Sequence, residues 1–164
     1  MRVLVFGDTG QLGTAFKNEI LSNIDVITIP KYNVKLTNYL AMKKKIKKIK
    51  PEVIINFLAF TDVDNCEIKQ KIAKNTNTIF PMLISKISKQ IGCVLIHFST
   101  DYVFFSDRHE FISEHKKTNP KSTYGLTKRN GETWILKSGC FHLILRTSWV
   151  YSDIRKNFFN SIKN

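Results

Sequence analysis

The sequence has only three cysteines, and no two of them are close together in the chain. Cys66, Cys93 and Cys140 lie far apart in a chain of 164 residues, and no C-x-x-C pair occurs. An odd, scattered set of this kind predicts neither a disulfide framework nor a zinc site. We interpret the three as small buried thiols and expect no metal centre.

Long hydrophobic runs are also absent. No apolar stretch approaches the roughly 20 residues that span a bilayer as a helix. The apolar start is short and leads into glycines, unlike a secretory signal peptide. We therefore expect a cytoplasmic protein without a membrane partner.

Acidic residues are scarce: 13 Asp and Glu face 26 Lys and Arg, a net charge of +13. Such a charge is typical of polyanion binders, but also of a lysine-rich solvated exterior. The densest run, 43–50, lies in a predicted helix over 38–50, whose apolar face is Tyr39, Met42, Ile46 and Ile49. No aromatic residues interleave with these lysines to stack bases. The pattern favours the solvated face, and we expect no nucleic-acid partner.

What the sequence does have is an alternation of strands and helices. Short apolar runs predict strands at 3–6, 26–29, 53–58, 93–98 and 143–146. Helices are predicted from about residue 12 to 20, then over 38–50, 68–75, 80–91 and 122–137, with a loop at 59–64 and an irregular segment at 106–121. This alternation predicts an α/β fold with a doubly wound, Rossmann-like parallel sheet, truncated after the fifth strand.

The first strand runs directly into a glycine turn. Gly7, Gly10 and Gly13 give the spacing G-x-x-G-x-x-G, followed by a helix that begins near Leu12. Glycines at a strand-to-helix turn let the backbone approach a pyrophosphate at the helix N-terminus. A purely structural turn is the alternative, and Asp8 places a negative charge near the proposed phosphates.

The second strand is not followed by the acid that often binds the ribose 2′-hydroxyl. Lys31 and Lys35 lie there instead and could face a 2′-phosphate or could be ordinary surface lysines. The pattern favours NADPH as cofactor, with NADH as the alternative.

A predicted helix carries Tyr124 and Lys128, spaced i and i+4 on one face. A free phenol has a pKa of about 10, and a nearby cation lowers it toward the range that proton transfer needs at neutral pH. Thr100, at the end of the fourth strand, can donate a hydrogen bond to the same substrate oxygen. The alternative is an ordinary amphipathic helix.

Five stretches in this order carry a resemblance to a known family: 7–13, 61–64, 99–104, 124–128 and 146–151. The chain resembles the extended short-chain dehydrogenases/reductases and, among them, the dTDP-4-dehydrorhamnose reductases. The resemblance implies NADP(H)-dependent reduction of the 4-keto group of a dTDP-linked deoxysugar, a step of dTDP-rhamnose biosynthesis.

The resemblance also implies site residues. Thr100, Tyr124 and Lys128 would be catalytic, with Tyr124 protonating the C4 oxygen and Lys128 binding the nicotinamide ribose. The cofactor would contact Tyr124 and Lys128 and also Gly7, Gly10, Gln11, Leu12, Ala59, Phe60 and Thr61. The sugar would contact Val63, Asp101, Tyr102 and Trp149, although Trp149 could equally be a core residue.

Some positions bear on the choice within the family. Related dehydratases carry an acid directly after the Thr-Asp pair, where this chain has Tyr102, so simple carbonyl reduction is favoured. Lys35 replaces a usual aspartate, which leaves the cofactor preference open, and Phe57 and Leu58 replace small residues beside the nicotinamide.

The resemblance also implies a longer protein. We expect residues 1–164 to form one dinucleotide-binding domain, with the start of a further helix at 157–163, and the C-terminal substrate-binding lobe to be absent. A truncated product, a homo-oligomer, or a separate chain that completes the lobe would each account for this. The alternative function is a non-catalytic dinucleotide-binding remnant or regulatory subunit.

Overall fold

A parallel sheet organises the chain in the computed structural model, which describes residues 1–20, 23–29, 36–105 and 111–151. Its strands are β1 (Arg2–Phe6), β2 (Asp25–Ile29), β3 (Val53–Asn56), β4 (Val94–Thr100) and β5 (His142–Thr147), in the order β2-β1-β3-β4-β5. Every pairing is parallel, for example Phe6 with Asn56 and Asn56 with His97. The predicted doubly wound α/β fold is confirmed.

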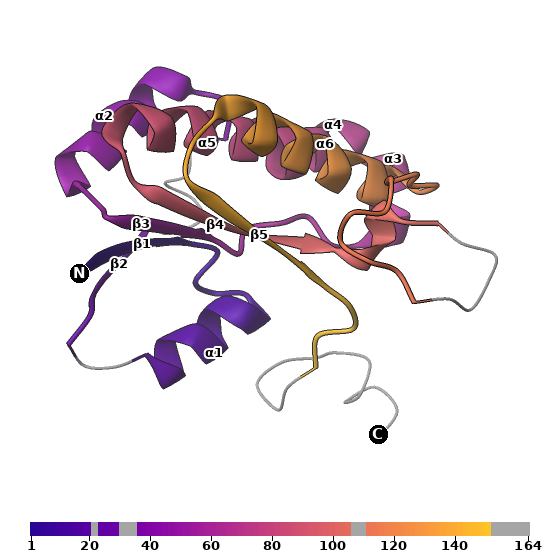
Figure 1. The fold of residues 1–164 in the computed structure, drawn as a ribbon, viewed down its shortest axis with the longest axis horizontal. Coiled ribbons are helices and arrows are strands. Elements are labelled where there is room, and N and C mark those ends of the chain that lie inside the picture. The colour runs from indigo at the N-terminus through magenta and orange to yellow at the C-terminus, as the bar shows by residue number, and fades with distance from the viewer. Residues whose placement is uncertain (21–22, 30–35, 106–110, 152–164) are drawn as a thin grey trace.

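The helices divide unequally between the two faces of the sheet (Figure 1). α2 (Tyr39–Ile49), α5 (Phe80–Ile91) and α6 (Thr123–Ser138) cover one face, and α1 (Gln11–Glu19) packs against the other. α3 (Val63–Ile68), α4 (Gln70–Lys74), the π-helix η2 (Asn75–Ile79) and the 3₁₀ turn η3 (Asp101–Val103) complete the helical elements of the described residues.

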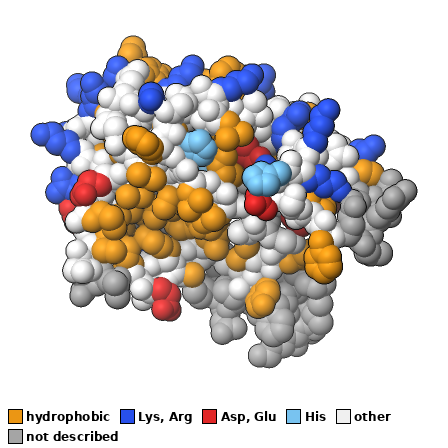
Figure 2. All heavy atoms as spheres, in the orientation of Figure 1, with side chains coloured by type: hydrophobic (Ala, Val, Ile, Leu, Met, Phe, Trp, Pro, Cys, Tyr) orange, Lys and Arg blue, Asp and Glu red, His pale blue; other side chains and the backbone are white. Residues whose placement is uncertain are grey.

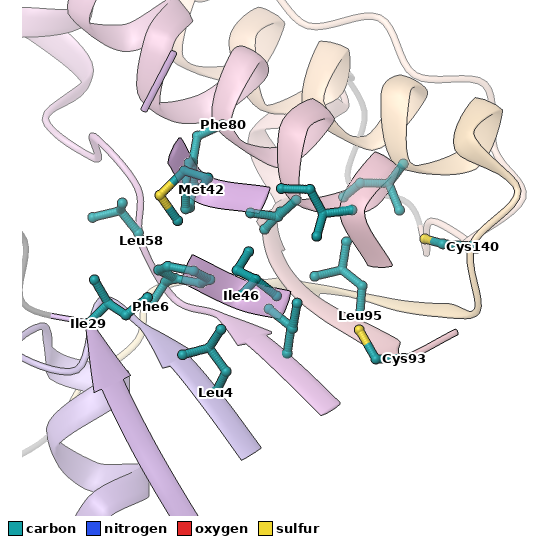
Figure 3. Packing of buried hydrophobic residues seen from close by; sticks show 14 residues of the cluster. Leu4, Phe6, Ile29, Met42, Ile46, Leu58, Phe80, Cys93, Leu95 and Cys140 are labelled. Atoms are coloured by element: carbon teal, nitrogen blue, oxygen red, sulfur yellow. The ribbon is translucent and has the colours of Figure 1, made fainter. Parts of the chain in front are cut away.

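The larger core lies between the sheet and the three-helix layer (Figure 3). Alternate residues of the strands, such as Leu4, Phe6, Ile54 and Leu95, point into it, as the two-residue repeat of a strand requires. Phe6 and Phe80 meet edge to face, with ring centroids 5.0 Å apart. The predicted burial of the cysteines is confirmed, since all three thiols are buried and free.

A hydrophobic patch lies on the α1 side of the sheet. Val94, Phe141 and Leu143 share that side of β4 and β5, and their exposed fractions are 38%, 74% and 49%. Figure 2 shows hydrophobic side chains gathered at the level of the sheet, with Lys and Arg side chains above them on the helices.

The lysine-rich helix presents its charges to solvent. Met42 and Ile46 of α2 are buried, whereas Lys44, Lys47 and Lys48 are exposed. This placement agrees with the solvated-face interpretation.

Several predicted boundaries were wrong, each for a local reason. The loop predicted at 59–64 ends early, because the Asp62 carboxylate accepts from Asn65 N (3.0 Å) and starts α3 at Val63. The helix predicted over 68–75 is interrupted at Lys69 and then continues through the π turn into α5. β3 ends at Asn56 rather than Leu58, and β4 extends to Thr100. The helix expected at 157–163 lies outside the described residues.

Candidate active site

A cleft of about 530 Å³ opens at the carboxyl ends of the strands, where open α/β sheets bind their ligands. It is lined by Gly10, Gln11, Leu12, Phe57, Ala59, Thr61, Val63, Phe98, Ser99, Thr100, Asp101, Tyr102, Tyr124, Lys128, Thr147, Trp149 and Val150. All the site residues predicted from the sequence are among them except Gly7 and Phe60.

Gly7 and Gly13 shape the turn below the cleft. Gly7 has a φ of +82°, and a Cβ there would lie 2.6 Å from the backbone nitrogen of Leu58. A Cβ on Gly13 would overlap the carbonyl of Gly7. Gly10 N donates to Gly7 O (3.0 Å), and α1 begins at the next residue, Gln11. The N-terminus of α1 therefore lies at the cleft, which Gly10, Gln11 and Leu12 line. Gly7 therefore acts through backbone packing rather than by lining the cleft.

The negative charge of Asp8 does not oppose this arrangement. Lys17 of α1 donates to the Asp8 carboxylate (3.3 Å), and Asp8 is 9% exposed. It is not among the residues that line the cleft. The ion pair with Lys17 therefore offsets the negative charge that Asp8 places near the proposed phosphates.

The segment after β3 approaches the cleft from the other side. Ala59, Thr61 and Val63 line it, whereas Phe60 packs in a small cluster with Cys66, Ala73 and Tyr124. Leu58 belongs to the main core, so only Phe57 narrows the cleft. The Phe57 and Phe98 rings are tilted to each other, with centroids 4.7 Å apart, and form an apolar wall. The sequence pointed to Phe57 beside the nicotinamide but not to Phe98.

α6 delivers Tyr124 and Lys128 from its first turns. The Ser122 hydroxyl caps the helix by accepting from Gly125 N (3.1 Å), and the Glu67 carboxylate accepts from Thr123 N (2.7 Å). Tyr124 is 8% exposed and Lys128 only 1%. Both side chains are thus held at the floor of the cleft rather than on a solvated helix face.

Burial governs the acid–base properties of this pair. It raises the pKa of the Tyr124 phenol, although a hydrogen bond with Thr100 acts in the opposite direction. Burial also lowers the pKa of Lys128 to about 8, partly offset by Glu132. The expectation that Lys128 lowers the pKa of Tyr124 was wrong for the free protein, because loss of hydration outweighs other effects on the phenol.

Thr100 is oriented differently from the sequence-based expectation. Its hydroxyl donates to the Asp101 carboxylate (3.0 Å) and accepts from Tyr102 N (3.2 Å). The other Asp101 oxygen accepts from the Ser148 hydroxyl (2.8 Å). In the free protein the proton of Thr100 is therefore directed to Asp101 rather than to a substrate oxygen.

The residues predicted to contact the sugar lie around the mouth of the cleft. The Tyr102 ring meets Tyr124 edge-on at 5.6 Å. Trp149 is 65% exposed, which excludes the alternative of a core tryptophan. Both rings line the cleft.

Sequence reasoning missed several cleft residues. Phe98, Ser99, Thr147 and Val150 line the cleft. Phe98 lies outside the family motifs, and the other three lie within the stretches 99–104 and 146–151 but were given no role. The parallel pairing of Ser99 with Arg146 and of Thr100 with Thr147 places the ends of β4 and β5 side by side. Because Thr147 lies beside Thr100 in this register, the register identifies Thr147 as a residue of the same cleft.

Two lining residues carry buried polar atoms without partners. Gln11 Nε2 and Ser99 Oγ make no hydrogen bond among the described residues. An unsatisfied buried donor costs about 1–3 kcal/mol. Together with the helix N-terminus, these atoms fit a ligand rich in acceptor oxygens, such as a dinucleotide.

Two other features concern excluded site types. In the described ranges no cluster of three or more His, Cys, Asp or Glu side chains could hold a metal ion. None of the helices described is long and apolar enough to cross a bilayer.

Lys31 and Lys35, the proposed determinants of cofactor preference, lie outside the described residues.

Comparison with known proteins identifies the family. A family model described as the RmlD substrate binding domain matches residues 1–164. The chain belongs to this family.

Several similar proteins are named dTDP-4-dehydrorhamnose reductase. A dTDP-4-dehydrorhamnose reductase of Shigella flexneri is 35% identical over 162 residues, covering 96% of this chain and 54% of the relative. A crystal structure of a dTDP-4-dehydrorhamnose reductase from Clostridium acetobutylicum superposes with a TM-score of 0.94 at 35% identity, covering 99% of this chain and 58% of the other. The corresponding enzyme of Bacillus anthracis, solved in complex with NADP, gives 0.94 at 31% identity with the same coverage. This RmlD-family chain thus spans about half the length of the relatives it matches.

Proposed function

We propose that this chain binds NADPH and supplies the catalytic residues for reduction of the 4-keto group of dTDP-4-dehydrorhamnose to dTDP-rhamnose. The observation that carries the proposal is the convergence in one cleft of the glycine turn, Thr100, Tyr124 and Lys128. The names of the relatives point to the same reaction, and one of them was solved with NADP.

The proposed binding of the cofactor uses groups that the fold leaves available. The N-terminus of α1 at Gln11 would hold the pyrophosphate, and the unpartnered Gln11 amide would donate to it. Lys128 would donate to the nicotinamide ribose, in addition to its bond to Phe98 O. When bound, the nicotinamide supplies the hydride that the carbonyl carbon accepts.

The proton would come from Tyr124. Its raised pKa keeps the phenol protonated at neutral pH, which suits a general acid that protonates a carbonyl oxygen. As the carbonyl carbon gains hydride, the C–O double bond becomes a single bond and the oxygen takes the phenol proton. The hydrogen bond with Thr100, which lowers the pKa of Tyr124, would favour the phenolate that remains.

The substrate would lie between the catalytic residues and the aromatic rim. Trp149 and Tyr102 would offer flat apolar surface to the deoxysugar, with Val63 and Asp101 beside them. The missing acid after Asp101 favours reduction without elimination of water.

The test is NADPH oxidation in the presence of dTDP-4-dehydrorhamnose. We expect steady turnover that falls by about 10²–10⁴-fold in Tyr124→Phe, the range for loss of a general acid, with NADPH affinity nearly unchanged. Tyr39→Phe is a matched control, since it removes a phenol on α2 that does not line the cleft. Equal activity of Tyr124→Phe and wild type would contradict the proposal.

A second function, a dinucleotide-binding subunit without activity of its own, is favoured by one observation. Phe57 lines the cleft and packs against Phe98, narrowing the space beside the glycine turn. Saturable NADPH binding without turnover, in the chain alone, would support this alternative. Recovery of turnover in Phe57→Ala would show that the ring blocks the cleft.

A further inference from the structure

The apolar wall of Phe57 and Phe98 has no part in the proton transfer proposed for this cleft. Both rings line the cleft and both are only partly buried, so each keeps a face that a ligand can reach. Ligand sites commonly combine apolar and aromatic surface with a few polar groups that fix the orientation of the ligand. The wall therefore fits a ligand that carries a flat apolar part.

The backbone of Phe57 is fixed against the glycine turn. Phe57 directly follows β3, and its N–H donates to Phe6 O (2.9 Å), one step beyond the last paired residues of β1 and β3. A Cβ on Gly7 would lie only 2.8 Å from the carbonyl carbon of Phe57. The close approach that Gly7 permits therefore sets where the Phe57 side chain begins.

The ring of Phe57 is held by rings from two other elements. Its centroid lies 5.7 Å from that of Phe16 of α1 and 4.7 Å from that of Phe98 of β4. All three rings pack against the apolar cluster on the α1 side of the sheet, which includes Val5 and Ile55. The wall is therefore formed before any ligand binds, and a ligand does not have to order it.

The wall lies between the two ends of the candidate site. The strand order places Phe57, after β3, between the glycine turn after β1 and the end of β4. The carbonyl of Phe98 accepts from the Lys128 ammonium, so the other ring of the wall adjoins the catalytic residues. A dinucleotide with its pyrophosphate at Gln11 would pass this wall with its nicotinamide half.

We propose that the Phe57 ring is a binding surface for the nicotinamide ring of the dinucleotide. The inference rests on the proposed function, because it requires that a dinucleotide occupies the cleft. It assigns the ring a role opposite to that of an obstruction: Phe57 supports the nicotinamide half of the cofactor instead of excluding it.

An aromatic side chain suits this ligand in both of its redox states. The reduced nicotinamide ring is uncharged and flat, and flat rings pack on aromatic side chains in offset or edge-to-face arrangements. The oxidised ring carries a positive charge, which the negative face of an aromatic ring attracts. An aliphatic side chain of similar size offers apolar contact but neither the flat face nor the charge distribution.

The experiment compares two ligands that differ only in the nicotinamide. NADPH and 2′-phospho-ADP-ribose, which lacks the nicotinamide ring, are titrated into each full chain by calorimetry. The variants are Phe57→Ala, which removes the ring, and Phe57→Leu, which keeps apolar volume. The matched control is Phe141→Ala, which removes a 74% exposed ring just before β5 that does not line the cleft. Because both ligands share the phosphates, general damage to the fold weakens both alike.

We expect Phe57→Ala to bind NADPH about tenfold more weakly than wild type, and 2′-phospho-ADP-ribose within about twofold of wild type. Phe57→Leu should fall between the two for NADPH, and Phe141→Ala should bind both ligands like wild type. In Phe57→Ala, equal weakening of both ligands, unchanged NADPH affinity or tighter NADPH binding would each overturn the inference. If wild type binds neither ligand, the proposed function fails, and the inference fails with it.

Discussion

At the residue scale, the behaviour of the site depends on a lysine that lacks contact with water. Lys128 is 1% exposed, and its ammonium donates to Phe98 O. His97, one residue before Phe98, is also fully buried, and its pKa lies well below the usual range because of burial and the nearby Lys128. The Asn56 amide donates to His97 Nδ1 (3.0 Å), so a neutral imidazole sits below the lysine. The charge of Lys128 is therefore costly and sensitive to pH.

The free energy of unfolding should therefore depend on whether Lys128 is charged. The pKa of Lys128 is lowered from 10.5 to about 8 on folding, so between these values the unfolded chain binds more protons than the folded one. Stability conferred by this site then rises with pH across that window, by up to about 3 kcal/mol. Denaturant unfolding at several pH values, wild type against Lys128→Met, isolates the effect. If the difference in unfolding free energy between wild type and Lys128→Met does not change from pH 8 to 10.5, the lowered pKa of Lys128 is contradicted.

The pKa of Tyr124 should shift in opposite directions when Thr100 and when Asp101 is replaced. Thr100 lowers the pKa of Tyr124 through a hydrogen bond, and the Asp101 charge raises it. Thr100→Val should therefore shift the phenolate titration upward, and Asp101→Asn should shift it downward. Ultraviolet difference titration against Tyr124→Phe measures both. Shifts of the same sign in the two variants would refute the arrangement.

The sequence predicted which residues meet but not how they are hydrogen-bonded. The glycine turn and the i, i+4 spacing of Tyr124 and Lys128 follow from local geometry, so both were found correctly. The direction of the Thr100 proton depends on Asp101 and on Ser148, which lies 47 residues after Asp101 in the chain. The sign of the Tyr124 pKa shift depends on burial, which no local pattern encodes.

At the element scale, α6 is held by charges as well as by apolar packing. Arg146 of β5 forms a bidentate pair with Glu132 of α6, at 2.9 and 2.7 Å, and Glu132 is 2% exposed. The guanidinium also lies over the Phe104 ring at 4.9 Å and donates to Glu114 O. The Arg146 side chain therefore connects α6, the edge strand β5 and the segment before α6.

Breaking this pair should cost much more than breaking an exposed one. Glu132→Gln leaves Arg146 without its carboxylate partner, and we expect the free energy of unfolding to fall by about 3 kcal/mol. Asp25→Asn breaks the Arg2–Asp25 pair (2.6 Å), which is half exposed, and should cost less than about 1 kcal/mol. Chemical denaturation compares the two variants. Equal losses would show that the buried pair has no special role in holding α6.

Element boundaries show where sequence reasoning has its limit. The period of apolar residues located β1, α2 and α6 within one or two positions. It did not predict η2, whose Asn77 bonds to Phe60 and Thr127, residues 17 and 50 positions away in the chain.

At the scale of the whole molecule, the sheet gathers residues from the length of the chain into one cleft. Lining residues run from Gly10 near the start to Val150 near the end of the described part. The strand order β2-β1-β3-β4-β5 places the glycine turn after β1 beside the segment that follows β3. The central claim is that a dinucleotide occupies this cleft beneath Trp149.

Two tryptophans make that claim directly measurable. Trp149 lies at the cleft, whereas Trp134 lies on the outer side of α6, beside Lys86. We predict that NADPH quenches tryptophan fluorescence saturably, that Trp134→Phe retains this quenching, and that Trp149→Phe loses it. Quenching that is absent, or that survives unchanged in Trp149→Phe, would contradict the account.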